Sequence, residues 1–371
     1  MLSLAAAYRK RFMKGMVAAV TGSCGKTTTK DMAAQCLARR FNTAASPKSY
    51  NNAVGVSLTL LSLRRDTEAA VLEIGTNRPG EVAELAAAAA PNMAVVLNAG
   101  KTHLEFFGSV EDVAGEKASL LDALPRDGTA VLNFDDPLVK KMSAGRKNKI
   151  LSFGLSEGAD VRAAGLKPDG HSAFSFDLVY GECRAGVKMN VPGTHNAHNA
   201  LAAAAISLAA GVTFAETASA LNSFVKTENM RMDLRRADGV ILLVDCYNSN
   251  PDSLAAALRF LACVPAVRRV AVLGDMLELG AMSREEHENA GRLCFELGVD
   301  MLVACGGEAA GMADGAVAAG METEKIRKCA DSRETSEALG AVIKSGDAVL
   351  FKASRRLALE GAASALEERL K

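Results

Sequence analysis

Tryptophan is absent from this 371-residue chain, and aromatic residues make up only 5% of it. Proteins that hold single-stranded nucleic acid stack its bases on aromatic side chains, and proteins that follow a duplex carry excess positive charge. Lys+Arg and Asp+Glu number 43 each, so the formal net charge is zero. The composition therefore argues against a nucleic-acid partner and against attraction to an anionic membrane surface.

The eight cysteines form no Cys-x-x-C pair, so the sequence gives no support to a zinc ribbon or a thioredoxin-like motif. No apolar run reaches the roughly 18 residues that a membrane helix needs. The basic residues 9–11 follow the apolar start of the chain, whereas in a signal peptide they precede it. A disulfide would be awkward at Cys24, inside a glycine-rich loop. We therefore expect a cytoplasmic protein without membrane insertion.

The stretch from Val17 to Thr29 carries the strongest signal, because an apolar run there ends in Thr-Gly-Ser-Cys-Gly-Lys-Thr-Thr. This pattern predicts a buried strand, a glycine turn and a helix start, where backbone N–H groups can surround phosphate oxygens. Lys26 can reach the β- and γ-phosphates, and the Thr27 hydroxyl can hold Mg²⁺. Two residues separate the glycines instead of the usual four, so an ordinary strand-to-helix turn is the alternative.

Short β-rich runs alternate with helical spacing along the chain, which predicts a parallel sheet covered by helices. The expected strands of the first part are 17–20, 69–74, 93–97 and 130–132, and the expected helices are 28–40, 80–89 and 110–123. Residues 155–190 predict an antiparallel excursion, followed by a long helix from Asn196 to about Ala210.

A second strand series begins near Val240, with expected strands at 240–244, 270–273, 301–304 and 348–351. We place a domain boundary near 227–232. The sequence thus predicts an α/β protein with two domains: a P-loop domain with a mostly parallel sheet at 1–229, and a Rossmann-like α/β domain at 230–371.

Polar side chains follow several predicted strands, at the sheet edge where ligands of such folds bind. Glu73 is well placed there for Mg²⁺, and the alternative is a solvated charge. His103 follows the next strand and can coordinate a metal or contact a phosphoryl group, although a lone histidine is more often structural. Lys117 lies in a predicted helix, and its spacing alone indicates only a solvated lysine.

Two amides, Asn196 and Asn199, share one face of the long predicted helix directly after His195. An amide offers both a donor and an acceptor, which suits the edge of adenine, while helix capping would explain only the first asparagine. In the second strand series, Asp245, the 274–280 segment and the 352–355 segment each follow a strand. They indicate one functional edge, although any one turn could be structural.

Together these motifs resemble the Mur ligase family, ATP-dependent ligases that form amide bonds in peptidoglycan synthesis. The resemblance runs from about Val17 to the C-terminus and is carried by TGSCGKTTTK (21–30), NNAVGVSLTLL (51–61), LEIGTNRPGEV (72–82), HLEFFGS (103–109), PGTHNAHNALAAAA (192–205), DCYNSNPDS (245–253), GDMLELG (274–280) and FKASR (351–355). Within the family, the chain is most similar to the type that adds D-alanyl-D-alanine to UDP-N-acetylmuramoyl-tripeptide.

The resemblance implies ATP, Mg²⁺ at two sites and a role for each matching residue. The catalytic residues would be Lys26, His103 and Lys117, the last carbamylated. The metal ligands would be Thr27, Glu73, His103 and the carbamylated Lys117. The nucleotide would contact Gly22, Ser23, Cys24, Gly25, Lys26, Thr27, Thr28, His195, Asn196, Asn199, Arg231 and Asp245. The acceptor carboxylate and the incoming amino acid or dipeptide would meet Asn51, Asn52, Asn77, Glu81, Asn248, Lys352, Ser354 and Arg355.

The chain departs from the family pattern in four places. Only 20 residues precede Thr21, so we expect the UDP-binding N-terminal domain to be missing, with a partner subunit as a replacement. This chain has Ser49 where the family pattern has an asparagine, Arg78 where it has a histidine, and Glu116 where it has an alanine.

Three functions therefore stay open. The motifs favour a UDP-muramoyl-peptide acceptor, whereas the missing domain slightly favours a smaller, non-peptidoglycan carboxylate. The third is a non-catalytic ATP-binding subunit, against which the retained site residues argue.

Overall fold

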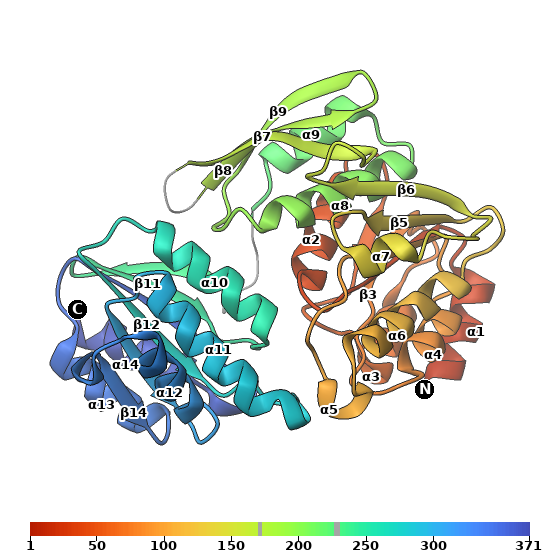
Figure 1. The fold of residues 1–371 in the computed structure, drawn as a ribbon. Coiled ribbons are helices and arrows are strands. Elements are labelled where there is room, and N and C mark those ends of the chain that lie inside the picture. The colour runs from red at the N-terminus through yellow and green to blue at the C-terminus, as the bar shows by residue number, and fades with distance from the viewer. Residues whose placement is uncertain (170–172, 226–230) are drawn as a thin grey trace. The chain divides into compact units, whose positions relative to one another are not determined.

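The computed structural model describes residues 1–169, 173–225 and 231–371, which form two compact units (Figure 1). Of these residues, the first unit holds 1–100, 106–169 and 173–225, and the second holds 101–105 and 231–371. The predicted domain boundary at 229/230 falls outside the described residues. Each unit is an α/β layer structure with its own sheet.

The strands of the first unit follow the apolar runs of the sequence. They are β1 (Met16–Thr21), β2 (Thr43–Ala45), β3 (Ala69–Glu73), β4 (Met93–Val96), β5 (Thr129–Asn133), β6 (Lys149–Gly154), β7 (Val161–Asp169), β8 (Ala173–Tyr180) and β9 (Cys183–Met189). Its helices are α1 (Leu2–Phe12), α2 (Lys26–Leu37), α3 (Ala53–Ser62), α4 (Glu81–Ala89), α6 (Val110–Asp122), α7 (Pro137–Lys141), α8 (Asn196–Ala209) and α9 (Phe214–Asn222). In the short helix α5 (Leu104–Phe107), the first two residues belong to the second unit and the last two to the first.

Among the described residues these strands form one nine-stranded sheet in the order β2-β3-β1-β4-β5-β6-β7-β8-β9. Pairing is parallel from β2 to β7, and β7, β8 and β9 pair antiparallel. The predicted antiparallel excursion is therefore confirmed. From β1 to β6 the parallel strands are joined through helices, as expected for βα units, whereas residues 155–160 join β6 to β7 without a helix.

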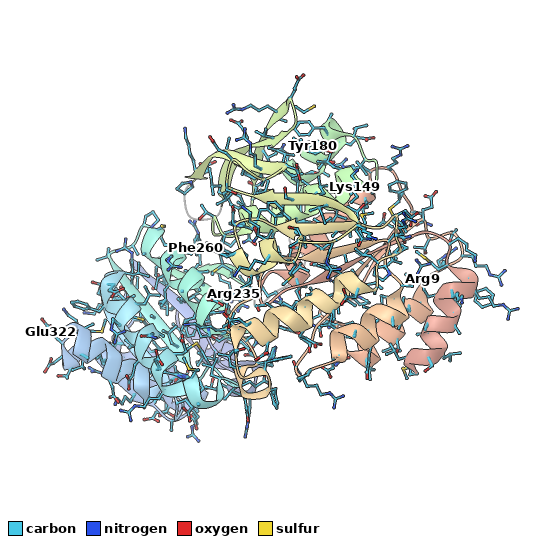
Figure 2. All side chains as sticks on the ribbon, turned by 45° about the vertical axis from the view of Figure 1, so that its right-hand side comes forward. Arg9, Lys149, Tyr180, Arg235, Phe260 and Glu322 are labelled. Carbon is cyan, nitrogen blue, oxygen red and sulfur yellow. The ribbon has the colours of Figure 1, made fainter. Side chains whose placement is uncertain are left out.

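Both faces of the parallel part are buried, which explains why its strands read as continuous apolar runs. In β1, Ala18 and Val20 pack into the core under α2 and α8, while Val17 and Ala19 pack into the core under α1, α3, α4 and α6. Arg9 of α1, labelled in Figure 2, is 8% exposed and donates to Ala89 O at 3.3 Å. That bond ties α1 to the end of α4.

The second unit repeats the layered arrangement around a six-stranded sheet of described residues, ordered β10-β11-β15-β12-β13-β14. Its strands are β10 (Asp233–Ala237), β11 (Val240–Asp245), β12 (Arg268–Gly274), β13 (Met301–Cys305), β14 (Ile326–Cys329) and β15 (Asp347–Lys352). Its helices are α10 (Pro251–Cys263), α11 (Ser283–Glu296), α12 (Ala310–Ala319), α13 (Ser332–Val342) and α14 (Glu360–Arg369), with short 3-10 turns η1 (Gly280–Met282), η2 (Thr323–Lys325) and η3 (Arg355–Leu357).

Only the edge strand β10 runs antiparallel within this described sheet, and the other pairs are parallel. Leu339 of α13 and Leu366 of α14 share a core with Val349 and Phe351 of the central strand β15. Arg235 of β10, labelled in Figure 2, pairs with Glu367 of α14 at 3.2 Å and thereby ties the edge strand to the last helix.

The predicted fold class, α/β with a large mostly parallel sheet and a second sheet, is confirmed. In the described residues, no helix has the length and apolar character that crossing a membrane requires.

Candidate functional site

The phosphate-loop sequence connects β1 to α2 as predicted, with β1 ending at Thr21 and α2 beginning at Lys26. Gly25 caps the helix in the left-handed region, at a φ of 83°. A Cβ atom at Gly25 would lie 2.2 Å from Oδ1 of Asn199, so a larger residue would clash as well as strain the backbone. The loop therefore requires glycine here, and the first N–H groups of α2, which follow it, have no carbonyl partner within their own helix.

Asn98, which follows β4, holds this loop in place. Its Oδ1 accepts a hydrogen bond of 2.8 Å from Cys24 N–H, and its backbone oxygen accepts one of 3.1 Å from Ser23 N–H. The Ser23 hydroxyl also accepts from Gly100 N–H at 2.9 Å. The sequence alone assigned Asn98 no role. The contact depends on the parallel pairing of β4 with β1, which the sequence does not show.

Glu73 ends β3 beside the phosphate loop and is 1% exposed. Its Oε2 accepts from the Thr27 hydroxyl at 2.8 Å, and its Oε1 accepts from the Asn51 amide at 2.8 Å. Among the described residues its carboxylate meets neutral donors and no cationic side chain. A buried carboxylate is costly without a compensating positive charge. Carboxylate and hydroxyl oxygens together therefore fit a hard divalent cation such as Mg²⁺.

Lys117 of α6 is buried at 2% exposure. Desolvation, and secondly the positive charge of Lys26, lower the pKa of Lys117 to about 7. No hydrogen-bond partner for its Nζ occurs in the described part of the chain. At pH 7 such an amine is about half neutral, and the neutral form is the nucleophile that reacts with carbon dioxide. Lys26 Nζ itself donates to Gly22 O at 2.7 Å, at the mouth of the loop.

The predicted adenine residues Asn196 and Asn199 are 7% and 8% exposed and belong to an internal chain of hydrogen bonds. Asn199 donates to Asn196 Oδ1 at 2.7 Å, and Asn196 donates to Pro192 O at 2.8 Å. Thr29 of α2 donates to Asn199 Oδ1 at 3.2 Å. The two amides thus join α8 to the phosphate-loop helix, while the neighbouring His195 is exposed. Their contact with adenine stays a prediction.

The residues predicted to meet the acceptor lie on two loops of the first unit. Asn51 reaches Glu73, whereas Asn52 caps α3 by accepting from Gly55 N–H at 2.9 Å. Asn77 is exposed, and its N–H donates to Glu81 Oε2 at 2.8 Å. The substrate roles of Asn51, Asn52, Asn77 and Glu81 stay predictions.

In the second unit, Lys352 at the end of β15 forms a buried ion pair with Asp245 at the end of β11. Lys352 Nζ lies 2.6 Å from Asp245 Oδ2 and donates to Asn248 O at 3.0 Å, while Lys352 is 1% exposed. The guanidinium carbon of Arg231 lies 4.0 Å from the centre of the Tyr247 ring. The structure therefore brings Arg231, Asp245, Asn248 and Lys352 together at one edge of the second sheet.

Ser354 and Arg355 follow Lys352 at the same edge. Ser354 is 4% exposed and accepts from Leu277 N–H at 3.0 Å, and Arg355 pairs with Glu360. His103 groups with the second unit, where its Nδ1 contacts the carboxylate of Glu278. That hydrogen bond from His103 is the main reason why the pKa of Glu278 is lowered. Sequence reasoning missed Glu278, since the two residues are 175 positions apart.

The described residues contain no group of three or more His, Cys, Asp or Glu side chains that could hold a metal ion. The oxygens of Thr27 and Glu73 are a smaller set, to which a carbamate on Lys117 would add further oxygens.

Comparison with known proteins matches both units to one family. Residues 20–207 match the Mur ligase middle domain, and residues 230–355 match the Mur ligase glutamate ligase domain. This chain belongs to the Mur ligase family. Members of this family are ATP-dependent ligases, so the predicted enzyme class is confirmed.

Several of the similar proteins are ligases that are named for adding D-alanyl-D-alanine to UDP-N-acetylmuramoyl-tripeptide. The UDP-N-acetylmuramoyl-tripeptide–D-alanyl-D-alanine ligase of Mycobacterium leprae is 37% identical, over 94% of this chain and 72% of that protein. A crystal structure of MurF from Acinetobacter baumannii has a TM-score of 0.91 at 30% identity and covers 99% of this chain and 80% of its own. MurF from Thermotoga maritima in complex with ADP has a TM-score of 0.86 at 30% identity, covering 100% and 83%.

Proposed function

We propose that this Mur ligase joins D-alanyl-D-alanine to the carboxylate of a UDP-N-acetylmuramoyl-tripeptide and splits ATP to ADP and phosphate. The observation that carries the proposal is the buried Glu73 carboxylate, bonded to Thr27 of the phosphate loop at 2.8 Å. It supports phosphoryl transfer at this corner. We infer the identity of the acceptor and of the amine from the names of similar ligases, among them the 37% identical protein of Mycobacterium leprae. They favour the muramoyl peptide over a smaller carboxylate.

The chemistry follows from charge. The acceptor carboxylate is a poor electrophile, so one of its oxygens attacks the γ-phosphate of ATP, and ADP leaves. Lys26 and the N–H groups at the start of α2 stabilise the negative charge on the transferring group. The amine then attacks the acyl carbon, loses a proton and expels inorganic phosphate. Mg²⁺, when bound, would supply further positive charge next to the phosphates.

We propose that Thr27, Glu73 and a carbamate on Lys117 hold Mg²⁺ in the first unit, while the metal role of His103, which belongs to the second unit, stays a prediction. The burial of Lys117 and its lack of a hydrogen-bond partner within the described residues support the carbamate, because a free charged amine is costly there. Lys117→Ala should abolish turnover, and added short-chain carboxylates should restore part of it. Full activity of Lys117→Ala would remove the carbamate from the mechanism.

We assign nucleotide binding to residues 1–229 and binding of the incoming amine to residues 230–371. For the second assignment, the paired charges of Asp245 and Lys352 offer groups of both signs, as a zwitterionic dipeptide requires. We also propose a cytoplasmic location, which all eight free cysteines support. The predicted partner subunit stays a prediction.

The test is ADP release from ATP in the presence of UDP-N-acetylmuramoyl-tripeptide and D-alanyl-D-alanine, compared with reactions that omit one substrate. We expect release only when both are present, and formation of the pentapeptide by mass spectrometry. Lys26→Ala serves as the inactive control, because it lacks the charge at the transferring phosphoryl group. Release that neither substrate stimulates would reject this acceptor and this amine.

A further inference from the structure

Beyond its buried first residue, Ile74, the loop that follows β3 is ordered by side-chain hydrogen bonds. This acceptor loop, residues 74–81, begins directly after Glu73, whose register partner in β1 is Val20. The Thr76 hydroxyl donates to Arg78 O at 2.8 Å, and Glu81 Oε2 accepts from Asn77 N–H at 2.8 Å. The tip of the loop is thus fixed although residues 77–80 are exposed.

Glu116, on the neighbouring helix α6, fixes the other end of the acceptor loop. Its Oε2 accepts from Gly80 N–H at 2.8 Å, and its Oε1 accepts from Val82 N–H at 2.7 Å. These are N–H groups at the start of α4, which lack partners within their own helix. The carboxylate therefore satisfies both donors and offsets the positive end of that helix.

Arg78 is presented at the tip of this fixed loop, with its side chain 74% exposed. Its Nε donates to Glu81 Oε1 at 3.0 Å, and within the described residues no partner engages its two terminal nitrogens. The bond at Nε orients the guanidinium plane, and the terminal edge is the edge that binds a carboxylate through two parallel hydrogen bonds. An exposed Arg–Glu pair contributes little stability by itself, so stability does not explain the arrangement.

Arg78 and Glu116 belong to one network, because Glu116 holds the loop whose tip carries Arg78. The oxygens of Glu81 and Glu116 are occupied by N–H donors, including Arg78 itself. A carboxylate that approaches the tip therefore meets an oriented positive charge.

We propose that Arg78 is a specificity-determining residue that binds a second carboxylate on the last residue of the acceptor, and that Glu116 positions it. This inference rests on the proposed function. Arg78 lies five positions after Glu73, a span of at most about 18 Å, so one acceptor residue can lie near both. A similar ligase of Acinetobacter baumannii carries 2,6-diaminopimelate in its name. That amino acid keeps one carboxylate when the other reacts, whereas lysine keeps none.

The experiment compares two UDP-N-acetylmuramoyl-tripeptides, one ending in 2,6-diaminopimelate and one ending in lysine, by ADP release with D-alanyl-D-alanine. For the wild type we expect kcat/KM to favour diaminopimelate by about tenfold to a hundredfold, the range of a charged bidentate contact. Arg78→Gln should remove this preference by raising KM for the diaminopimelate acceptor only. Arg78→Lys should keep part of it, because the charge remains without the planar fork.

Arg64→Gln is the matched control, since Arg64 is also exposed, at 81%, and also pairs with a nearby carboxylate through Nε. Arg64→Gln should leave kcat/KM for both acceptors unchanged. Use of both acceptors with the same ratio in Arg78→Gln as in the wild type would overturn the inference alone. ADP release with neither acceptor would overturn the proposed function and the inference with it.

The positioning role of Glu116 has its own readout. Glu116→Gln should reduce the preference for diaminopimelate in the wild-type background and have no such effect in Arg78→Gln, because the loop then carries no charge to position. KM for ATP should change by less than about twofold, as expected for a local loop effect. Glu111→Gln, an exposed change on the same helix, is the control. Equal effects of Glu116→Gln in both backgrounds would contradict the positioning role.

Discussion

The Thr27 hydroxyl of the phosphate loop donates a hydrogen bond of 2.8 Å to Oε2 of Glu73 at the end of β3. The register of the sheet explains the contact: β1 and β3 are parallel neighbours, and Val20 is paired with Glu73. A nucleotide loop and an acidic strand end, 46 residues apart in sequence, thereby meet at one corner.

Replacing Glu73 by glutamine should leave the fold intact and abolish most of the activity. Glutamine has the same shape and can still accept from Thr27, but it lacks the negative charge that a divalent cation requires. We expect ligation to fall by at least about a hundredfold, as when a major electrostatic group is removed. The measurements are ADP release and the melting temperature. Glu84→Gln, an exposed change on α4, is the control, and comparable activities of the two variants would contradict the magnesium assignment.

Replacing Gly25 by alanine should prevent nucleotide binding. Gly25 has a φ of 83°, and its added Cβ would lie 2.2 Å from Asn199 Oδ1. The loop would have to move away from the internal amide chain, so we expect ATP affinity to fall by more than about tenfold. Titration calorimetry measures the affinity directly. Gly115→Ala on α6 is matched in chemistry, has no atom within 4 Å of its new Cβ, and should bind ATP normally.

Much of this corner could be predicted from the sequence, because local patterns determine it. The apolar run before the glycine turn predicts β1 and the start of α2, and βα alternation predicts that Glu73 lies at the same sheet edge. The contacts of Asn98, Glu116 and Glu278 could not be predicted, because each joins segments that only the tertiary fold brings together. The mutual bonding of Asn196 and Asn199 was also missed, although their three-residue spacing allows it.

Replacing Lys352 by methionine should destabilise the second unit. The Nζ atom of Lys352 lies 2.6 Å from Asp245 Oδ2, and Lys352 is 1% exposed, so its loss leaves a largely buried carboxylate without its cation. Breaking one side of a buried pair typically costs about 3–5 kcal/mol of unfolding free energy. Urea unfolding measures this loss of unfolding free energy. Lys328→Met removes an exposed Lys–Asp pair and should cost less than about 1 kcal/mol; equal losses would contradict the prediction.

The buried amine of Lys117 should make stability depend on pH in a defined window. Burial, with the charge of Lys26, lowers its pKa from 10.5 to about 7 in the folded chain. Between these two values the unfolded chain binds a proton that the folded chain does not, so the free energy of unfolding rises with pH. Below about pH 7 the buried amine is charged in both states, and the full cost of burying that charge remains.

Lys117→Met should therefore be more stable than the wild type at pH 6, by on the order of a few kcal/mol. The difference should shrink steadily between pH 7 and 10.5, because the wild-type amine then becomes neutral in the folded chain first. Thermal unfolding in metal-free buffer without dissolved carbon dioxide measures this, since a carbamate would otherwise alter the charge. Lys141→Met, an exposed change on α7, should give a difference that does not vary with pH. If the Lys117→Met difference were equally constant, Lys117 would carry no lowered pKa, and the neutral amine required for the carbamate would lose its physical basis.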